Sequence, residues 1–245
     1  MIWRCCAVAV LAVGGGFLTA TIGFGGAIFT MMFFPYMFPF IQASAISSAI
    51  VYVGILVLTW QYRAYIQWKS ILLPVACYVT CGVWVVYMLP EFDVQGLKLC
   101  FGVFILLLAI YYMIFSNRIH LKGSLLAAVI CSSLSGIGTG LFGIGGPPIA
   151  LYILSVSEDD KNVYLGTLQA FFSISMLFTN GARVTSGILT TALIPCILAG
   201  LVGTLVGKWC GTKVAAHMNI ELIKKCVCVF MVLSGVTTIA DCLLT

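Results

Sequence analysis

About eight apolar runs divide the chain, and the short separators between them hold nearly all of its charge. The runs lie at about residues 2–34, 43–62, 70–89, 97–115, 121–155, 163–181, 188–207 and 222–240. Charged residues make up 8% of the 245 positions, against roughly 25% in an ordinary soluble domain. Since a spanning helix needs ~20 apolar residues, the sequence predicts an all-α integral protein that crosses the cell membrane several times.

The first and fifth runs are too long to be simple spanning helices. Some 33 helical residues would measure about 50 Å, whereas the hydrocarbon core is only ~30 Å thick. Glycine interrupts both runs, at residues 23–26 in the first and residues 143–146 in the fifth. We therefore expect each run to be a glycine-broken helix or a re-entrant hairpin, with non-helical backbone at these glycines.

The chain also contains an internal repeat. Gly16 and Arg63 match Gly136 and Arg183 at an offset of 120 residues, and the offset grows to 126 near the C-terminus. We interpret the chain as two four-segment repeats, residues 1–117 and 118–245, within one transmembrane domain. The broken run opens each repeat.

Loop charges indicate how the two repeats are oriented. If each broken run is a hairpin that enters and leaves on one side, each repeat crosses three times and the two are inverted. That arrangement places nine of the 12 basic residues on one side, whereas eight simple crossings would divide them 6 to 6. Because basic loops favour the cytoplasmic side, the sequence favours inverted repeats with both termini outside.

The helix breaks are the candidate binding site. A break inside the membrane frees backbone groups, which are tolerated only in buried or wet surroundings, and a helix N-terminus favours an anion. No lysine, arginine or carboxylate is expected in mid-span, so backbone N–H groups and hydroxyls are the expected donors. The predicted substrate-binding residues, between the repeats near the midplane, are Gly25, Gly26, Ser47, Gly145, Gly146, Pro147, Thr167 and Gln169.

Arg63 and Arg183 end corresponding helices of the two repeats. We expect them at the vestibules, where they either attract anions or anchor the helix ends at the interface. No catalytic group, metal site or cofactor is expected. The predicted partners are a small anion and the lipid bilayer, but not nucleic acid, because the basic residues are scattered in short loops. A homo-oligomer is compatible with the sequence.

Two alternatives to an anion permease stay open. A permease for another solute, such as a transition metal, would use soft ligands, which the 11 Cys and 9 Met residues provide. A membrane redox protein would need a vicinal Cys pair near a cofactor site, and no CxxC pair is present. An enzyme is not predicted, because no nucleophile with an adjacent base stands out.

Two motif pairs resemble the sulfite exporter TauE/SafE family. They are GFGG at residues 23–26 with ASAISS at 43–48, and GLFGIGGPP at 140–148 with GTLQA at 166–170. The resemblance covers essentially the whole chain. It implies a membrane permease that exports or exchanges sulfite, an organosulfonate or a related anion by alternating access. The first motif departs from the second because no proline pair follows its two glycines.

The inverted topology predicts that the loops at residues 118–122 and 208–225 are both cytoplasmic. Single cysteines placed in each loop of a Cys-depleted chain should react with a membrane-impermeant maleimide only after the cells are opened. Reaction of either loop in intact cells would contradict the topology.

Overall fold

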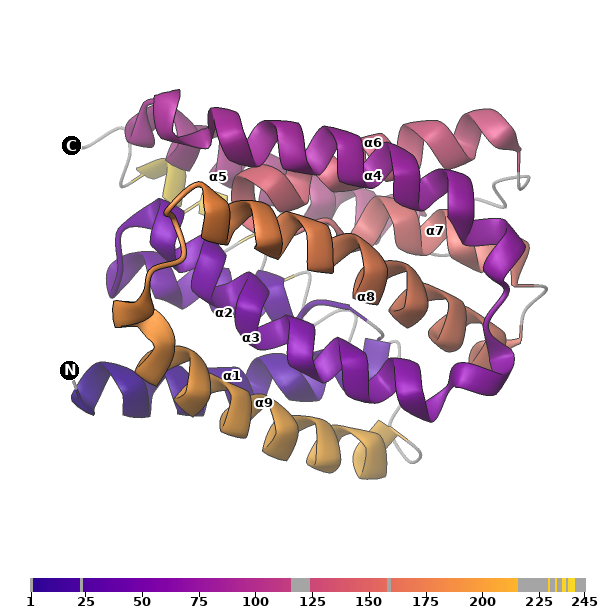
Figure 1. Ribbon diagram of the computed structural model, residues 1–245, viewed down its shortest axis with the longest axis horizontal. Helices are drawn as coiled ribbons and strands as arrows, with labels where there is room; N and C mark the ends of the chain where they lie inside the picture. Colours follow the sequence, from indigo (N-terminus) through magenta and orange to yellow (C-terminus); the bar gives the residue numbers. More distant parts are fainter. Residues whose placement is uncertain are drawn as a thin grey trace.

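The computed structural model describes residues 2–22, 24–115, 124–157 and 160–215, together with Val229, Val232 and residues 235–236 and 238–240. All regular structure within these residues is helical (Figure 1). The α-helices are α1 (Ile2–Ile22), α2 (Gly26–Phe33), α3 (Phe40–Gln61), α4 (Trp68–Met88), α5 (Val94–Phe115), α6 (Leu125–Phe142), α7 (Gly146–Val156), α8 (Lys161–Thr185) and α9 (Ile194–Ala215). Four short 3-10 helices join them, at Phe34–Tyr36, Arg63–Tyr65, Leu89–Glu91 and Thr191–Leu193.

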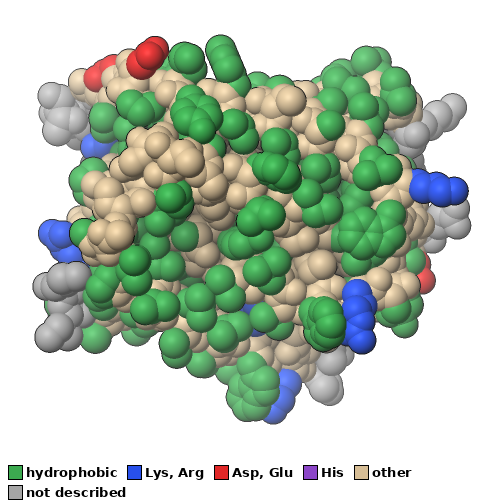
Figure 2. Space-filling view, in the orientation of Figure 1, with side chains coloured by type: hydrophobic (Ala, Val, Ile, Leu, Met, Phe, Trp, Pro, Cys, Tyr) green, Lys and Arg blue, Asp and Glu red, His purple; other side chains and the backbone are tan. Residues whose placement is uncertain are grey.

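Within the described residues, five helical stretches are long and apolar enough to cross a membrane. They are Trp3–Thr21, Phe40–Gln61, Trp68–Glu91, Leu125–Phe142 and Thr191–Lys213. On the face drawn in Figure 2, charged side chains lie mostly toward the two ends, and hydrophobic side chains cover the region between them. The predicted multi-pass membrane protein is confirmed. The eighth predicted run, residues 222–240, lies largely outside the described residues.

Both predicted helix breaks are present. The first separates α1 from α2, and Gly25 has a φ of 107° there. The second separates α6 from α7, and Gly143 has a φ of 72°. Side chains other than glycine rarely adopt such positive φ values, so these two glycines allow the chain to turn. Gly23 belongs to the first predicted break but lies outside the described residues.

Each break reverses the direction of the chain. Helix α2 returns along α1, and a Cβ at Gly26 would lie 2.7 Å from the Gly15 carbonyl oxygen. Helix α7 returns along α6, where the Ile149 N–H donates to Ser135 Oγ over 3.0 Å. The first and fifth runs are therefore helical hairpins, and their turns lie inside the protein.

The two hairpins differ by one residue in register. Gly26 packs against Thr19, whereas the matching Thr139 packs against Gly145. The 120-residue offset pairs Gly26 with Gly146 instead. The sequence alignment pairs identical glycines. In the structure, the tight turn at Gly143 makes α7 contact α6 one residue earlier than α2 contacts α1.

Helix α1 packs along α9 through small residues. Gly203 and Gly207 face the backbone carbonyls of Ala9 and Val13, so closely that a Cβ at either glycine would overlap them. Close backbone approach of this kind is a common way for helices to associate in lipid, where no hydrophobic effect drives them together. The two helices run in the same direction.

Helix α4 packs along α6 in a similar manner. A Cβ at Gly140 would lie 2.9 Å from the Gly82 carbonyl oxygen, and one at Gly136 would lie 3.0 Å from the Tyr78 Cα. This pair is also parallel. Helices α3 and α8 cross between the two pairs in opposite directions, and Ser48 Oγ donates to Asn180 Oδ1 over 2.7 Å at their contact.

The helices fall into two sets of opposite direction. Helices α1, α3 and α9 run from left to right in Figure 1, and α4 and α8 run from right to left. Because α6 is parallel to α4, its hairpin enters the protein from the right, whereas the α1–α2 hairpin enters from the left. The two turns therefore approach each other from opposite ends of the molecule.

One charged residue is not where the sequence predicted it. Lys208 was expected in the loop at residues 208–225, but α9 continues to Ala215 and buries the Lys208 side chain. The sequence prediction ended the apolar run at residue 207 because Lys208 is charged, whereas α9 continues to Ala215. The rest of that loop lies outside the described residues.

The α1–α9 contact predicts the effect of adding one methyl group. Gly207→Ala should lower the free energy of unfolding by about 1–3 kcal/mol, because the Cβ cannot fit against Val13 without separating the helices. Gly181→Ala is the control, because Gly181 has no atom within 4 Å of its missing Cβ. Thermal unfolding in detergent measures both, and equal melting temperatures would contradict the packing.

Candidate anion site between two glycine turns

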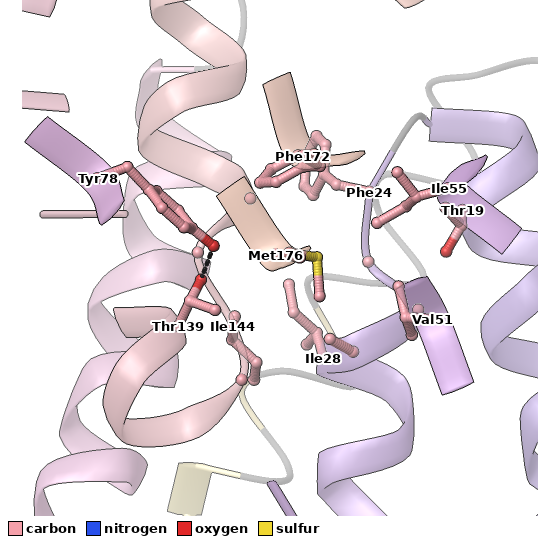
Figure 3. A pocket seen from close by; sticks show the side chains of 16 residues that line it. Thr19, Phe24, Ile28, Val51, Ile55, Tyr78, Thr139, Ile144, Phe172 and Met176 are labelled. Carbon is pink, nitrogen blue, oxygen red and sulfur yellow. Dashed lines mark hydrogen bonds between the residues drawn. The ribbon is translucent and has the colours of Figure 1, made fainter. Parts of the chain in front are cut away.

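The two glycine turns meet and line one pocket (Figure 3). A Cβ at Gly146 would lie 2.8 Å from the Cβ of Phe24, so the second turn is in contact with the first. The pocket holds about 420 Å³ of space not filled by atoms, part of it open to the outside. Its other walls come from α3, α4 and α8, through Val51, Ile55, Tyr78, Phe172 and Met176.

Four predicted site residues line this pocket, namely Gly25, Gly26, Gly145 and Gly146. They come from positions 120 residues apart, and the fold brings them together because the two hairpins enter from opposite ends. Glycine keeps side chains out of the turns, so a bound group can approach the backbone itself.

The other four predicted residues are buried but do not line the pocket. Ser47 forms a hydrogen bond with Thr30, and Thr167 accepts one from the Gln67 N–H at the start of α4. Pro147 packs in the first turn of α7, and Gln169 is buried within α8. The hydroxyl groups of Ser47 and Thr167 thus bond to other parts of the protein.

Sequence reasoning missed the aromatic wall of the pocket. The Tyr78 hydroxyl donates to Thr139 Oγ1 over 2.6 Å, and both residues line the pocket (Figure 3). Tyr78 stands inside an ordinary apolar run, so nothing marked it. Thr139 did carry a signal, because it matches Thr19 in the internal repeat and both threonines line the pocket.

The hydrogen-bond donors of the pocket come mainly from the first hairpin. Gly26, Ala27 and Ile28 line it, and their N–H groups donate to no acceptor in the described part of the chain. The first N–H groups of a helix have no partner within the helix. At α7 the same positions hold two prolines, which have no N–H, and the next N–H is bound to Ser135.

The sequence predicted that Arg183 would lie in a vestibule, but the structure buries it in the last turn of α8. Its side chain is 0% exposed. Nη2 donates to the carbonyl oxygens of Thr139 and Gly140 over 2.7 and 3.1 Å, and Nη1 donates to Ser44 Oγ over 2.8 Å. Helix α8 continues past Arg183, so a residue near a helix end can still face the interior.

Arg63 behaves differently from its repeat partner. It is exposed, lies 4.3 Å from the centre of the Trp60 ring and donates to the Trp60 carbonyl oxygen. This is the anchoring contact that a cation makes at a membrane interface. The two arginines therefore have different roles despite their matching positions.

The electrostatics of the pocket favour negative charge. The C-terminal carbonyls of α6 carry partial negative charge, and Arg183 neutralises them. The N-terminus of α2 contributes partial positive charge at the opposite wall. The described acidic residues Glu91, Asp93 and Asp160 are all exposed, and none of them lines the pocket.

Comparison with known families agrees with this geometry. A family model described as sulfite exporter TauE/SafE matches residues 7–238. The chain belongs to the TauE/SafE sulfite exporter family. The resemblance carried by the glycine motifs is thereby confirmed over nearly the whole chain.

Membership of the TauE/SafE family fixes the general activity. The chain is an integral membrane transporter and not an enzyme. No curated protein and no solved structure matches it. The family name identifies a class of transporter, and the identity of the transported solute has to be argued from the pocket.

Arg183 generates a prediction with a matched control. Arg183→Gln should reduce the free energy of unfolding by about 3 kcal/mol, because two helix-end carbonyls and Ser44 lose a charged donor. Arg183→Lys should recover little of this stability, since one ammonium cannot reproduce the several hydrogen bonds of the planar guanidinium group. Arg63→Gln should leave stability within about 0.5 kcal/mol. Detergent unfolding curves decide, and equal effects at both arginines would contradict the assignment.

Proposed function

We propose that this chain transports a small oxyanion, of the sulfite or organosulfonate class, by alternating access at the pocket between the two hairpins. The observation that carries the proposal is the first turn of α2, because Gly26, Ala27 and Ile28 line a pocket without a described carboxylate and their N–H groups have no acceptor in the described part of the chain. Backbone donors hold an oxyanion through several bonds at once, as other helix N-termini do. The sulfur oxyanions follow from the family as the first class to test.

We also infer that residues 1–117 and 118–245 are inverted repeats. Support comes from the exchange of packing partners, because α1 of the first half packs on α9 of the second, and α6 packs on α4. The hairpins enter from opposite ends, and α3 and α8 run in opposite directions. A pair of inverted halves around one pocket is the architecture in which alternating access is often found.

The described basic residues support the orientation of these repeats. Arg63, Lys69, Lys161 and Lys213 lie at the helix ends on the right of Figure 1, whereas Arg4 and Lys98 lie at the opposite end. Basic residues gather on the cytoplasmic side. The right end in Figure 1 is therefore assigned to the cytoplasm, and the α6–α7 hairpin enters from that side.

Reconstituted protein tests the proposed function directly. Proteoliposomes loaded with radiolabelled sulfite or taurine should release the label faster than empty liposomes, and unlabelled sulfite should compete. A membrane potential of either sign should change the rate if net charge moves. Release that is not saturable, or a preference for divalent metal ions over oxyanions, would overturn the proposal.

The N–H groups of α2 can be removed singly with proline. Ala27→Pro should raise the KM for the anion about tenfold, because a hydrogen bond to a charged group contributes ~1.5–3 kcal/mol. The helix should survive, since proline fits the first turn of a helix and the chain already places Pro147 after Gly146. Ala27→Gly keeps the N–H and should leave KM nearly unchanged. An unchanged KM for Ala27→Pro would show that α2 does not bind the anion.

A further inference from the structure

The Lys208 side chain lies against Gly54, in space that any larger residue at position 54 would fill. Its side chain is 4% exposed and extends from α9 to α3. A Cβ at Gly54 would lie 2.5 Å from Lys208 Cε and 2.6 Å from Lys208 Nζ. The ammonium therefore takes the space that the side chain at position 54 would need.

The Lys208 ammonium has no partner in the described part of the chain. Nζ is buried and forms no hydrogen bond there. Helices α1 and α3, which pack against α9, contain no aspartate or glutamate, and neither does α9 itself. The ionisable groups on these helices are Arg4, Cys5, Cys6, Tyr52, Cys196, Cys210 and Lys213.

An unpaired buried lysine is costly. The effective penalty for removing an ammonium from water is several kcal/mol, even after the surroundings relax. A helix-packing role does not require the charge, because a methionine would fill the same slot. Lys213, on the same helix, avoids this penalty because it is exposed, and its Nζ lies 3.6 Å from the centre of the Trp209 ring.

The slot lies directly behind the wall of the anion pocket. Gly54 stands on α3 between Val51 and Ile55, and both of these residues line the pocket. Val51 and Ile55 are apolar and buried, and a charge acts over a longer range in such surroundings than in water. The charge of Arg183 is already bound to the end of α6, whereas the charge of Lys208 is not committed to any described group.

We propose that Lys208 is the charge-balancing residue of the substrate site, and that its ammonium pairs electrostatically with the oxyanion held at the first turn of α2. This inference rests on the proposed anion transport. It restricts the substrate to solutes whose bound group carries a full negative charge, as sulfite and a sulfonate group do, since an uncharged group leaves the ammonium unbalanced. It also assigns α9 a direct part in binding, although no α9 side chain lines the pocket.

Lys208→Met tests the proposal, because methionine keeps the length of the side chain and removes the charge. In detergent, added sulfite should raise the melting temperature of the wild type but not that of Lys208→Met. Without sulfite, Lys208→Met should be at least as stable as the wild type, because an unpaired buried charge has been removed. In proteoliposomes its KM for sulfite should rise about tenfold or more. Lys213→Met is the matched control and should behave as the wild type in all three measurements.

A second variant moves the ammonium without removing it. Gly54→Ala places a Cβ against Lys208 Cε and Nζ and should raise the KM for sulfite as well, whereas Gly181→Ala should not. If Lys208→Met binds sulfite normally, or is less stable than the wild type without sulfite, the assignment of Lys208 is wrong and anion transport still stands. If the wild type neither transports sulfite or taurine nor is stabilised by them, both the proposed function and this inference fail.

Discussion

Every backbone N–H and C=O group that leaves a helix inside a membrane must find a partner, because lipid offers none. This constraint governs the two hairpins around which the rest of the protein is built. In the second hairpin several of these groups are bonded or absent. Arg183 donates to the last carbonyls of α6, Pro147 and Pro148 remove two N–H groups, and Ser135 accepts a third.

The first hairpin does not satisfy the constraint in the same way. Its return helix opens with Gly26, Ala27 and Ile28, which keep their N–H groups and line the pocket. Among the described residues, no arginine is seen to bond to it, and Arg63 remains at the surface. The two hairpins thus differ, because the second has more of its backbone groups bonded or replaced by proline, whereas the first keeps N–H groups that the proposed function assigns to the substrate. The proline pair is the clearest mark of this difference in the sequence.

The sequence predicted the helical membrane architecture and both breaks, because excess length and glycine clusters can be recognised within a single segment of the sequence. It also brought Gly25, Gly26, Gly145 and Gly146 to one site through the repeat. It could not predict the surroundings of side chains that contact distant helices. Ser47 and Thr167 look like ligands by type but bond to neighbouring helices, and Tyr78 looks like packing but lines the pocket. Only the crossing of α3, α4 and α8 decides between these outcomes.

The two buried cations show the same limit and also explain how an anion can be bound and released. Arg183 and Lys208 both lie near the ends of apolar runs, where charged residues are predicted from the sequence to be exposed to water. Arg183 is fixed by three hydrogen bonds, so its charge stabilises the fold. Lys208 is held only by the shape of its slot against Gly54. A cation behind the wall attracts an anion without forming the short, desolvated contact that would trap it. In the proposed mechanism, binding through backbone N–H groups, with the balancing charge one helix away, combines selectivity for anions with an affinity low enough for release.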